Sequence, residues 1–171
     1  MTIYALSSGS GISGIAVIRV SGKSTAEIVK KITGAQLPTP RVATLTKFNK
    51  NGTKELIDEG VIIWFPAPNS YTGEDLAEFH VHGSRAVISA LHSSISKIKN
   101  CRLAEPGEFT KRAFLNEKID LTQAESVADL IAAQTASALV AAHSSLSGEF
   151  SKLINKTIDK VIAARVLVEA C

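Results

Sequence analysis

Residues 65–83, FPAPNSYTGEDLAEFHVHG, decide how the fold of this chain is interpreted. The segment begins with a proline-broken turn and ends in Leu76–Gly83, where apolar residues alternate with ionisable ones. The ionisable residues are Glu78, His80 and His82. Successive side chains of a strand point to opposite faces of a sheet. The alternation therefore predicts an inner strand with one face in the core and three ionisable groups on the other face.

The composition is that of an ordinary globular protein, because 45% of the 171 residues are hydrophobic and 20% are charged. A net charge of +3 permits a nucleic-acid partner but does not indicate one. Cys101 and Cys171 make neither a disulfide framework nor a zinc-binding pattern, which favours a reducing cytosol. We find no signal peptide and no apolar run of membrane-spanning length. These features predict a cytoplasmic protein without a membrane partner.

Strands and helices alternate over the first two thirds of the chain. Branched and aromatic residues between turn signals predict strands at 3–6, 14–20, 41–48, 57–65 and 76–83. Capping residues and apolar spacing predict helices at 23–34 and 84–100, followed by a short strand and a loop at 101–109.

From Phe109 onward the pattern is almost entirely helical. Eight alanines and neither glycine nor proline lie between Leu121 and Leu146, which favours helix. The apolar stripe of this stretch is interrupted at Thr135, and Gly148 is expected to break it. The predicted fold class is therefore α+β, a mixed sheet with helices, followed by a mainly α-helical arm.

Two glycine-containing motifs resemble nucleotide-binding motifs, but neither has the neighbouring residues or elements that such a site needs. Gly9, Gly11 and Gly14 match the dinucleotide-binding spacing, but they lead into a predicted strand where that motif needs a helix. The sequence of residues 22–24, Gly-Lys-Ser, resembles the end of a phosphate-binding P-loop. Val17 stands where that loop needs its first glycine, so no P-loop is predicted.

The ionisable face of residues 76–83 has three interpretations. His80 and His82 share a face and could ligate a metal, with Glu78 as a third ligand. The face could instead be a polar surface against solvent or an interface. The third interpretation is an organic ligand, because a carboxylate in a mostly apolar site accepts two parallel N–H donors from a guanidine-like edge.

Four segments carry a family resemblance: GISGIAVIRVSG, IIWFPAPNSYTGEDLAEFHVHG, PGEFTKRAFLNEKIDLTQAESVADLI and SSLSGEFS. From Tyr4 to Cys171 the chain resembles the N-terminal region of the MnmE (TrmE) family of tRNA-modification GTPases. The resemblance implies that residues 1–118 form a tetrahydrofolate-binding and dimerisation domain similar to the aminomethyltransferase of glycine cleavage. Residues 119–171 would be the first part of a helical domain, truncated before the Ras-like G domain that the family inserts there.

The resemblance also implies a function for the whole protein. A family member hydrolyses GTP with Mg²⁺ and K⁺ and acts with the FAD-dependent partner MnmG. Together they modify carbon 5 of the wobble uridine (U34) of tRNA, and tetrahydrofolate supplies the one-carbon unit. Because the present chain lacks a P-loop, we do not expect it to hydrolyse GTP by itself.

The family's contacts to 5-formyltetrahydrofolate fall on Arg19, Glu78 and Lys118, with no catalytic residue and no metal ligand in this chain. The pterin ring presents an amino group and a ring N–H side by side, which Glu78 could accept. Arg19 and Lys118 suit the formyl oxygen or the anionic glutamate tail. The alternatives are a stand-alone, aminomethyltransferase-like folate enzyme, a metal-binding module using His80 and His82, and a domain that only dimerises.

Overall fold

The computed structural model of the chain describes residues 1–9 and 11–169, without the side chains of residues 149 and 150. Cys171, one of the two cysteines predicted to be unpaired, lies outside the described residues; Cys101 is a free thiol. The chain divides into two compact units, Met1–Arg112 and Ala113–Cys171.

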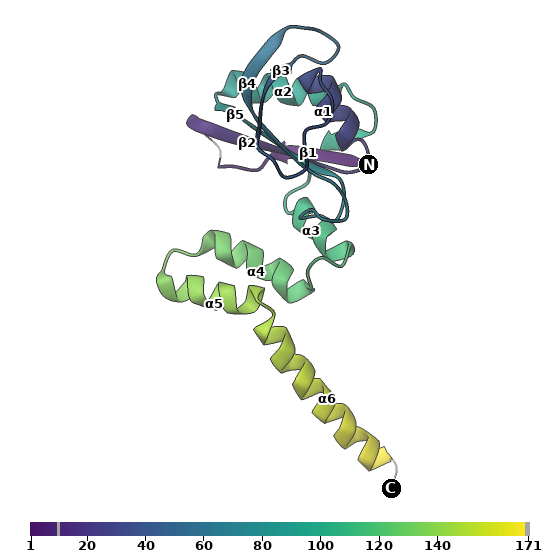
Figure 1. The fold of residues 1–171 in the computed structure, drawn as a ribbon. Helices are drawn as coiled ribbons and strands as arrows, with labels where there is room; N and C mark the ends of the chain where they lie inside the picture. Colours follow the sequence, from purple (N-terminus) through teal and green to yellow (C-terminus); the bar gives the residue numbers. More distant parts are fainter. Residues whose placement is uncertain (10, 170–171) are drawn as a thin grey trace. The chain divides into compact units, whose positions relative to one another are not determined.

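Within the described part of the first unit, six strands form one sheet in the order β3-β4-β5-β2-β1-β6 (Figure 1). The strands are β1 (Thr2–Leu6), β2 (Ser13–Ser21), β3 (Thr44–Asn49), β4 (Leu56–Phe65), β5 (Leu76–Gly83) and β6 (Cys101–Leu103). The β1–β6 pair is parallel and the other neighbouring pairs are antiparallel, so the predicted mixed sheet is confirmed. The strand predicted from the opening segment, β5, lies inside the sheet between β4 and β2.

Two helices, α1 (Thr25–Thr33) and α2 (Arg85–Ser96), supply the apolar side chains that cover one face of the sheet. Gly34 ends α1 with a left-handed backbone, at φ 67°, as its position after the helical pattern predicts. The core between these layers has no exposed surface at Ile18, Val20, Ile28, Val29, Ile32, Phe48, Phe79, Leu91 and Ile95. Burial of a side chain of this size contributes roughly 1.5–3 kcal/mol to folding.

The burial of β5 follows the predicted alternation. Ala77 and Phe79 are completely buried, and the Phe79 ring packs edge-on against Phe48 at a centroid distance of 5.4 Å. Glu78 and His80 lie half-buried on the opposite face of the strand. We call the side of the sheet that carries Arg19, Glu78 and His80, opposite α1 and α2, the site face.

The remaining helices are α3 (Glu108–Leu115), α4 (Leu121–Ala132), α5 (Ala136–Leu146) and α6 (Glu149–Glu169), which confirms the predicted helical arm. The predicted interruption at Thr135 separates two helices, because the Thr135 hydroxyl accepts a hydrogen bond from the Ala138 N–H and caps α5. Asp120 and Gln123 cap the start of α4 reciprocally. Gly148, at φ 76°, separates α5 from α6 as predicted. Within the described residues, no helix is both long and apolar enough to span a bilayer.

Two predicted boundaries differ from those of the structure by three residues or more. The strand predicted from residue 41 begins at Thr44, because Arg41 has a left-handed backbone and its N–H donates to the Trp64 carbonyl outside the ladder. The helix predicted for 84–100 ends at Ser96, although Ile98 beyond its end is still buried as the apolar spacing indicated.

Substitution of Gly60 tests how closely β4 and β5 approach. A Cβ atom at Gly60 would lie 2.1 Å from the His80 carbonyl oxygen, whereas one at Gly14 would meet open space. We expect Gly60→Ala to lower the free energy of unfolding by about 1–3 kcal/mol or more. Denaturant unfolding measures the difference, with Gly14→Ala on β2 as the matched control. Equal unfolding midpoints for the two variants would contradict the close approach.

Candidate ligand-binding site

Arg19 and Glu78 face each other directly across β2 and β5. Directly opposed residues of an antiparallel pair lie on the same face within side-chain reach. The Arg19 Nε and Nη2 groups donate to Glu78 Oε1 at 3.0 and 2.7 Å. The two side chains are only 26% and 17% exposed, so this charge-assisted contact is partly shielded from water. The structure thus brings together two of the three predicted folate contacts.

The second carboxylate oxygen of Glu78 faces a histidine. Oε2 lies 3.5 Å from His80 Nε2, beyond a normal hydrogen bond. That nitrogen is buried, and no described residue is its hydrogen-bond partner. A cavity of about 190 Å³ lies beside His80, with Ile15, Glu59 and Val61 in its lining.

His82 has a different acidic partner from His80. Its Nδ1 lies 2.9 Å from Asp58 Oδ1, and its backbone N–H donates to Asp58 Oδ2 at 2.8 Å. Burial raises the pKa of Asp58, but hydrogen bonds from His82 and from the Glu59 N–H outweigh this and lower it below its usual range. Among the described residues, no three histidine, cysteine or acidic side chains lie together as a metal site would need.

Two aromatic rings flank the guanidinium of Arg19. Its Cζ lies 5.5 Å from the ring centre of Tyr71 and 5.6 Å from that of Phe109, both within cation–π range. Tyr71 comes from the loop between β4 and β5, and Phe109 comes from α3. The Tyr71 hydroxyl lies 2.9 Å from Thr110 Oγ1, which joins the loop to the helix.

Sequence reasoning did not identify these two aromatic residues as part of the site. Each lies in a turn-rich segment, NSYTGED or PGEF, where no periodicity reports which way a side chain points. The sequence feature that comes closest to indicating their role is that both lie inside segments that resemble the family.

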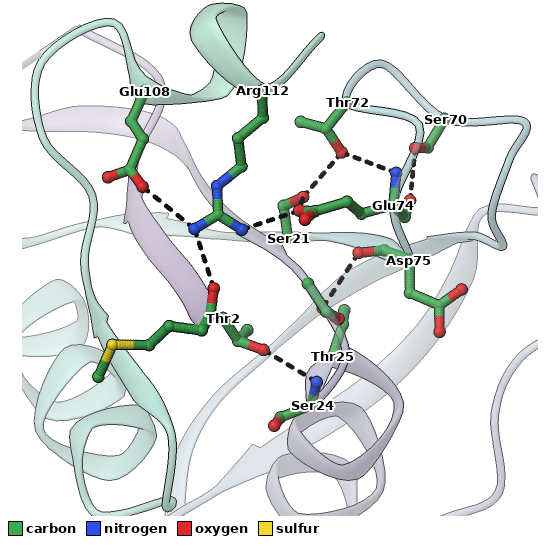
Figure 2. A network of polar contacts seen from close by, with 12 residues as sticks. Thr2, Ser21, Ser24, Thr25, Ser70, Thr72, Glu74, Asp75, Glu108 and Arg112 are labelled. Carbon is green, nitrogen blue, oxygen red and sulfur yellow. Dashed lines mark hydrogen bonds and ion pairs between the residues drawn. The ribbon is translucent and has the colours of Figure 1, made fainter. Parts of the chain in front are cut away.

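The loop and α3 are held by the network of polar contacts in Figure 2. Arg112 donates to Glu74 Oε2 at 2.8 Å, to Glu108 Oε1 at 3.1 Å and to the Met1 carbonyl at 2.9 Å. The Ser21 hydroxyl donates to the same Glu74 carboxylate at 2.8 Å. These contacts tie the loop that carries Tyr71 to the helix that carries Phe109.

Glu108 is the most strongly perturbed acid of this network. It is almost fully buried and accepts from two Arg102 nitrogens at 2.7 Å and from the Glu105 N–H at 2.8 Å. Burial alone would raise its pKa, but the hydrogen bonds from Arg102, Glu105 and Arg112 outweigh burial and hold the pKa at about 2.

Lys118, the third predicted contact, belongs to the second unit. It follows α3, where its backbone N–H donates to the Ala113 carbonyl at 2.9 Å, and its side chain is exposed. Its role in the site stays a prediction.

Two family models match the chain. The model of the GTP-binding protein TrmE N-terminus matches residues 2–118, and that of the MnmE helical domain matches residues 121–171.

The sequence is similar to proteins named tRNA modification GTPase MnmE. The chain is 61% identical over 170 residues to that of Pelagibacter ubique (strain HTCC1062). It is 50% identical over 169 residues to that of Coxiella burnetii (strain RSA 493 / Nine Mile phase I) and 45% identical over 169 residues to that of Paramagnetospirillum magneticum (strain ATCC 700264 / AMB-1). Each match covers 99% of this chain, but only 38%, 36% and 38% of the respective relative.

The contribution of Glu108 to stability should depend on pH. Its pKa is about 2 in the folded chain against 4.5 for an ordinary glutamate, so the contribution is complete above about pH 4.5 and is lost as the pH falls towards 2. The difference corresponds to roughly 3 kcal/mol. Denaturant unfolding between pH 7 and pH 2 should therefore show the gap between wild type and Glu108→Gln closing with acid. Glu105→Gln, which changes an exposed acid, is the control. A gap that does not vary with pH would contradict the role of Glu108.

Proposed function

Because the chain belongs to the MnmE (TrmE) family of tRNA modification GTPases, we propose that it is the folate-binding and homodimerising N-terminal module of such an enzyme. The chain spans less than two fifths of the length of the relatives compared above, so the activity of the whole protein is part of the proposal. Residues 1–118 bind the folate and dimerise, and residues 119–171 begin the helical domain. The whole protein works in the cytoplasm.

In this proposal the whole protein binds GTP with Mg²⁺ and K⁺ and acts on tRNA with the FAD-dependent MnmG. The two proteins modify carbon 5 of U34, and 5-formyltetrahydrofolate is the form of the one-carbon donor that this module binds. The task of the module is to hold and orient that donor, and we assign no catalytic residue to this chain.

The observation that carries the folate proposal is the contact between Glu78 and a guanidinium on the site face. Glu78 already accepts two N–H donors, those of Arg19 Nε and Nη2. A pterin presents an amino group and a ring N–H with the same N–C–N spacing as a guanidine. The donor set of the pterin edge therefore fits the acceptor that β5 positions at Glu78.

The basic residues supply charge for the rest of the ligand. Arg19 stands beside Glu78 on the neighbouring strand, and the exposed ammonium of Lys118 is the contact that the family resemblance adds. Both suit a formyl oxygen or the carboxylates of the glutamate tail. The rival metal site is not supported, because His80 and His82 face different acids.

The first test replaces Glu78 by its neutral isostere. We expect Glu78→Gln to weaken binding of 5-formyltetrahydrofolate about 10- to 100-fold, since hydrogen bonds to a charged group contribute roughly 1.5–3 kcal/mol. Titration calorimetry measures the affinity, and circular dichroism checks the fold. The control is Glu27→Gln, which neutralises an exposed carboxylate on α1, on the opposite side of the sheet. If Glu78→Gln binds as tightly as wild type, Glu78 does not contact the ligand.

The second test concerns Lys118. An exposed ion pair contributes about 0.2–1 kcal/mol, so Lys118→Gln is expected to weaken 5-formyltetrahydrofolate binding about 1.4- to 5-fold. Lys111→Gln removes an equally exposed lysine from α3 and should leave the affinity unchanged. Identical affinities for both variants and wild type would take Lys118 out of the site.

A further inference from the structure

We infer that Arg19 and the pterin edge compete for Glu78, and that Tyr71 and Phe109 are the ring-contacting residues of the site. This inference rests on the proposed folate function and adds two residues and an exchange step to it. It starts from what Glu78 holds in the structure: a planar guanidinium, bound through two N–H groups and flanked by two aromatic rings.

The guanidinium of Arg19 and the edge of a pterin are chemically alike. A guanidinium and the amino-pyrimidinone edge of a pterin are both flat, and both present adjacent N–H donors on one N–C–N unit. A site that binds one through a carboxylate can bind the other in the same plane. The rings of Tyr71 and Phe109, now within 5.6 Å of the Arg19 Cζ, would then contact the larger π-system of the ligand.

Arg19 uses only one of the two carboxylate oxygens of Glu78. Both of its donors converge on Oε1, while Oε2 has His80 Nε2 at 3.5 Å. Two parallel N–H groups on the two oxygens form a stronger and more specific pair than two on one oxygen. A pterin edge that uses both oxygens therefore makes a contact with Oε2 that Arg19 leaves unmade.

The segments that carry the two rings are tied together, whereas the hydrogen bonds of the Arg19 guanidinium go to a single side chain. Arg112 ties α3, which carries Phe109, to the loop that carries Tyr71 through Glu74, and its contact with Glu108 lies within α3 (Figure 2). Within the described residues, the guanidinium of Arg19 donates to Glu78 alone. Ligand binding is then an exchange: the side chain of Arg19 rotates away from Glu78 and presents its charge to an anionic part of the ligand.

The experiment follows the Arg19 Nε–H signal in nitrogen-15 NMR spectra of the 171-residue chain, assigned with Arg19→Lys. In the ligand-free protein, the signal should carry the shifts of a hydrogen-bonded group near aromatic rings. Addition of 5-formyltetrahydrofolate should change the chemical shifts of this signal. Addition of p-aminobenzoylglutamate, which lacks the pterin, should leave them unchanged.

Affinities of ring variants complete the test. Tyr71→Leu and Phe109→Leu should each weaken 5-formyltetrahydrofolate binding about 3- to 10-fold, as expected for the loss of one aromatic contact. Phe114→Leu, which changes an exposed phenylalanine at the other end of α3, should not. Binding with an unmoved Arg19 signal, or with full affinity in both ring variants, would overturn this inference and leave the folate proposal standing. Failure of the wild-type chain to bind 5-formyltetrahydrofolate would overturn both.

Discussion

The antiparallel register between β2 and β5 is the constraint on which the site depends. It sets Ile18 against Phe79 in the core and, one position along, Arg19 against Glu78 on the site face. A slip of one residue would turn Phe79 out and drive Glu78 into an apolar core, at a cost of several kcal/mol. The packing of the core therefore specifies the placement of the charged pair, even though neither charge takes part in that packing.

The groups that surround Arg19 are positioned in two different ways. The sheet positions the carboxylate rigidly, because β5 is hydrogen-bonded on both sides. The aromatic rings come from a loop and a helix, and an ionic network around Arg112 ties these segments together. Loops on a rigid scaffold commonly carry binding residues, and here partly buried ion pairs hold the loop of Tyr71 against α3.

The sequence predicted features whose signal is local. The alternation in LAEFHVHG predicted both faces of β5, and Gly34 and Gly148 marked the ends of helices. Pairing between strands that are far apart in the chain has no local signal. The family resemblance had named Arg19 and Glu78 as ligand contacts, but the structure was needed to show that the two side chains contact each other. Tyr71 and Phe109 escaped prediction because turns have no period, and the role of Lys118 still rests on the resemblance.

The order of strands in the sheet has a consequence for the kinetics of folding. The hairpin of β3 and β4 closes over a few residues, whereas Arg19 and Glu78 are 59 positions apart in the chain. Joining distant strands requires a large loss of chain entropy before any contact compensates for it, and such pairings slow folding. We therefore expect the carboxylate and its guanidinium partner to meet late in folding, so that a newly made chain acquires its candidate site only after distant strands have paired.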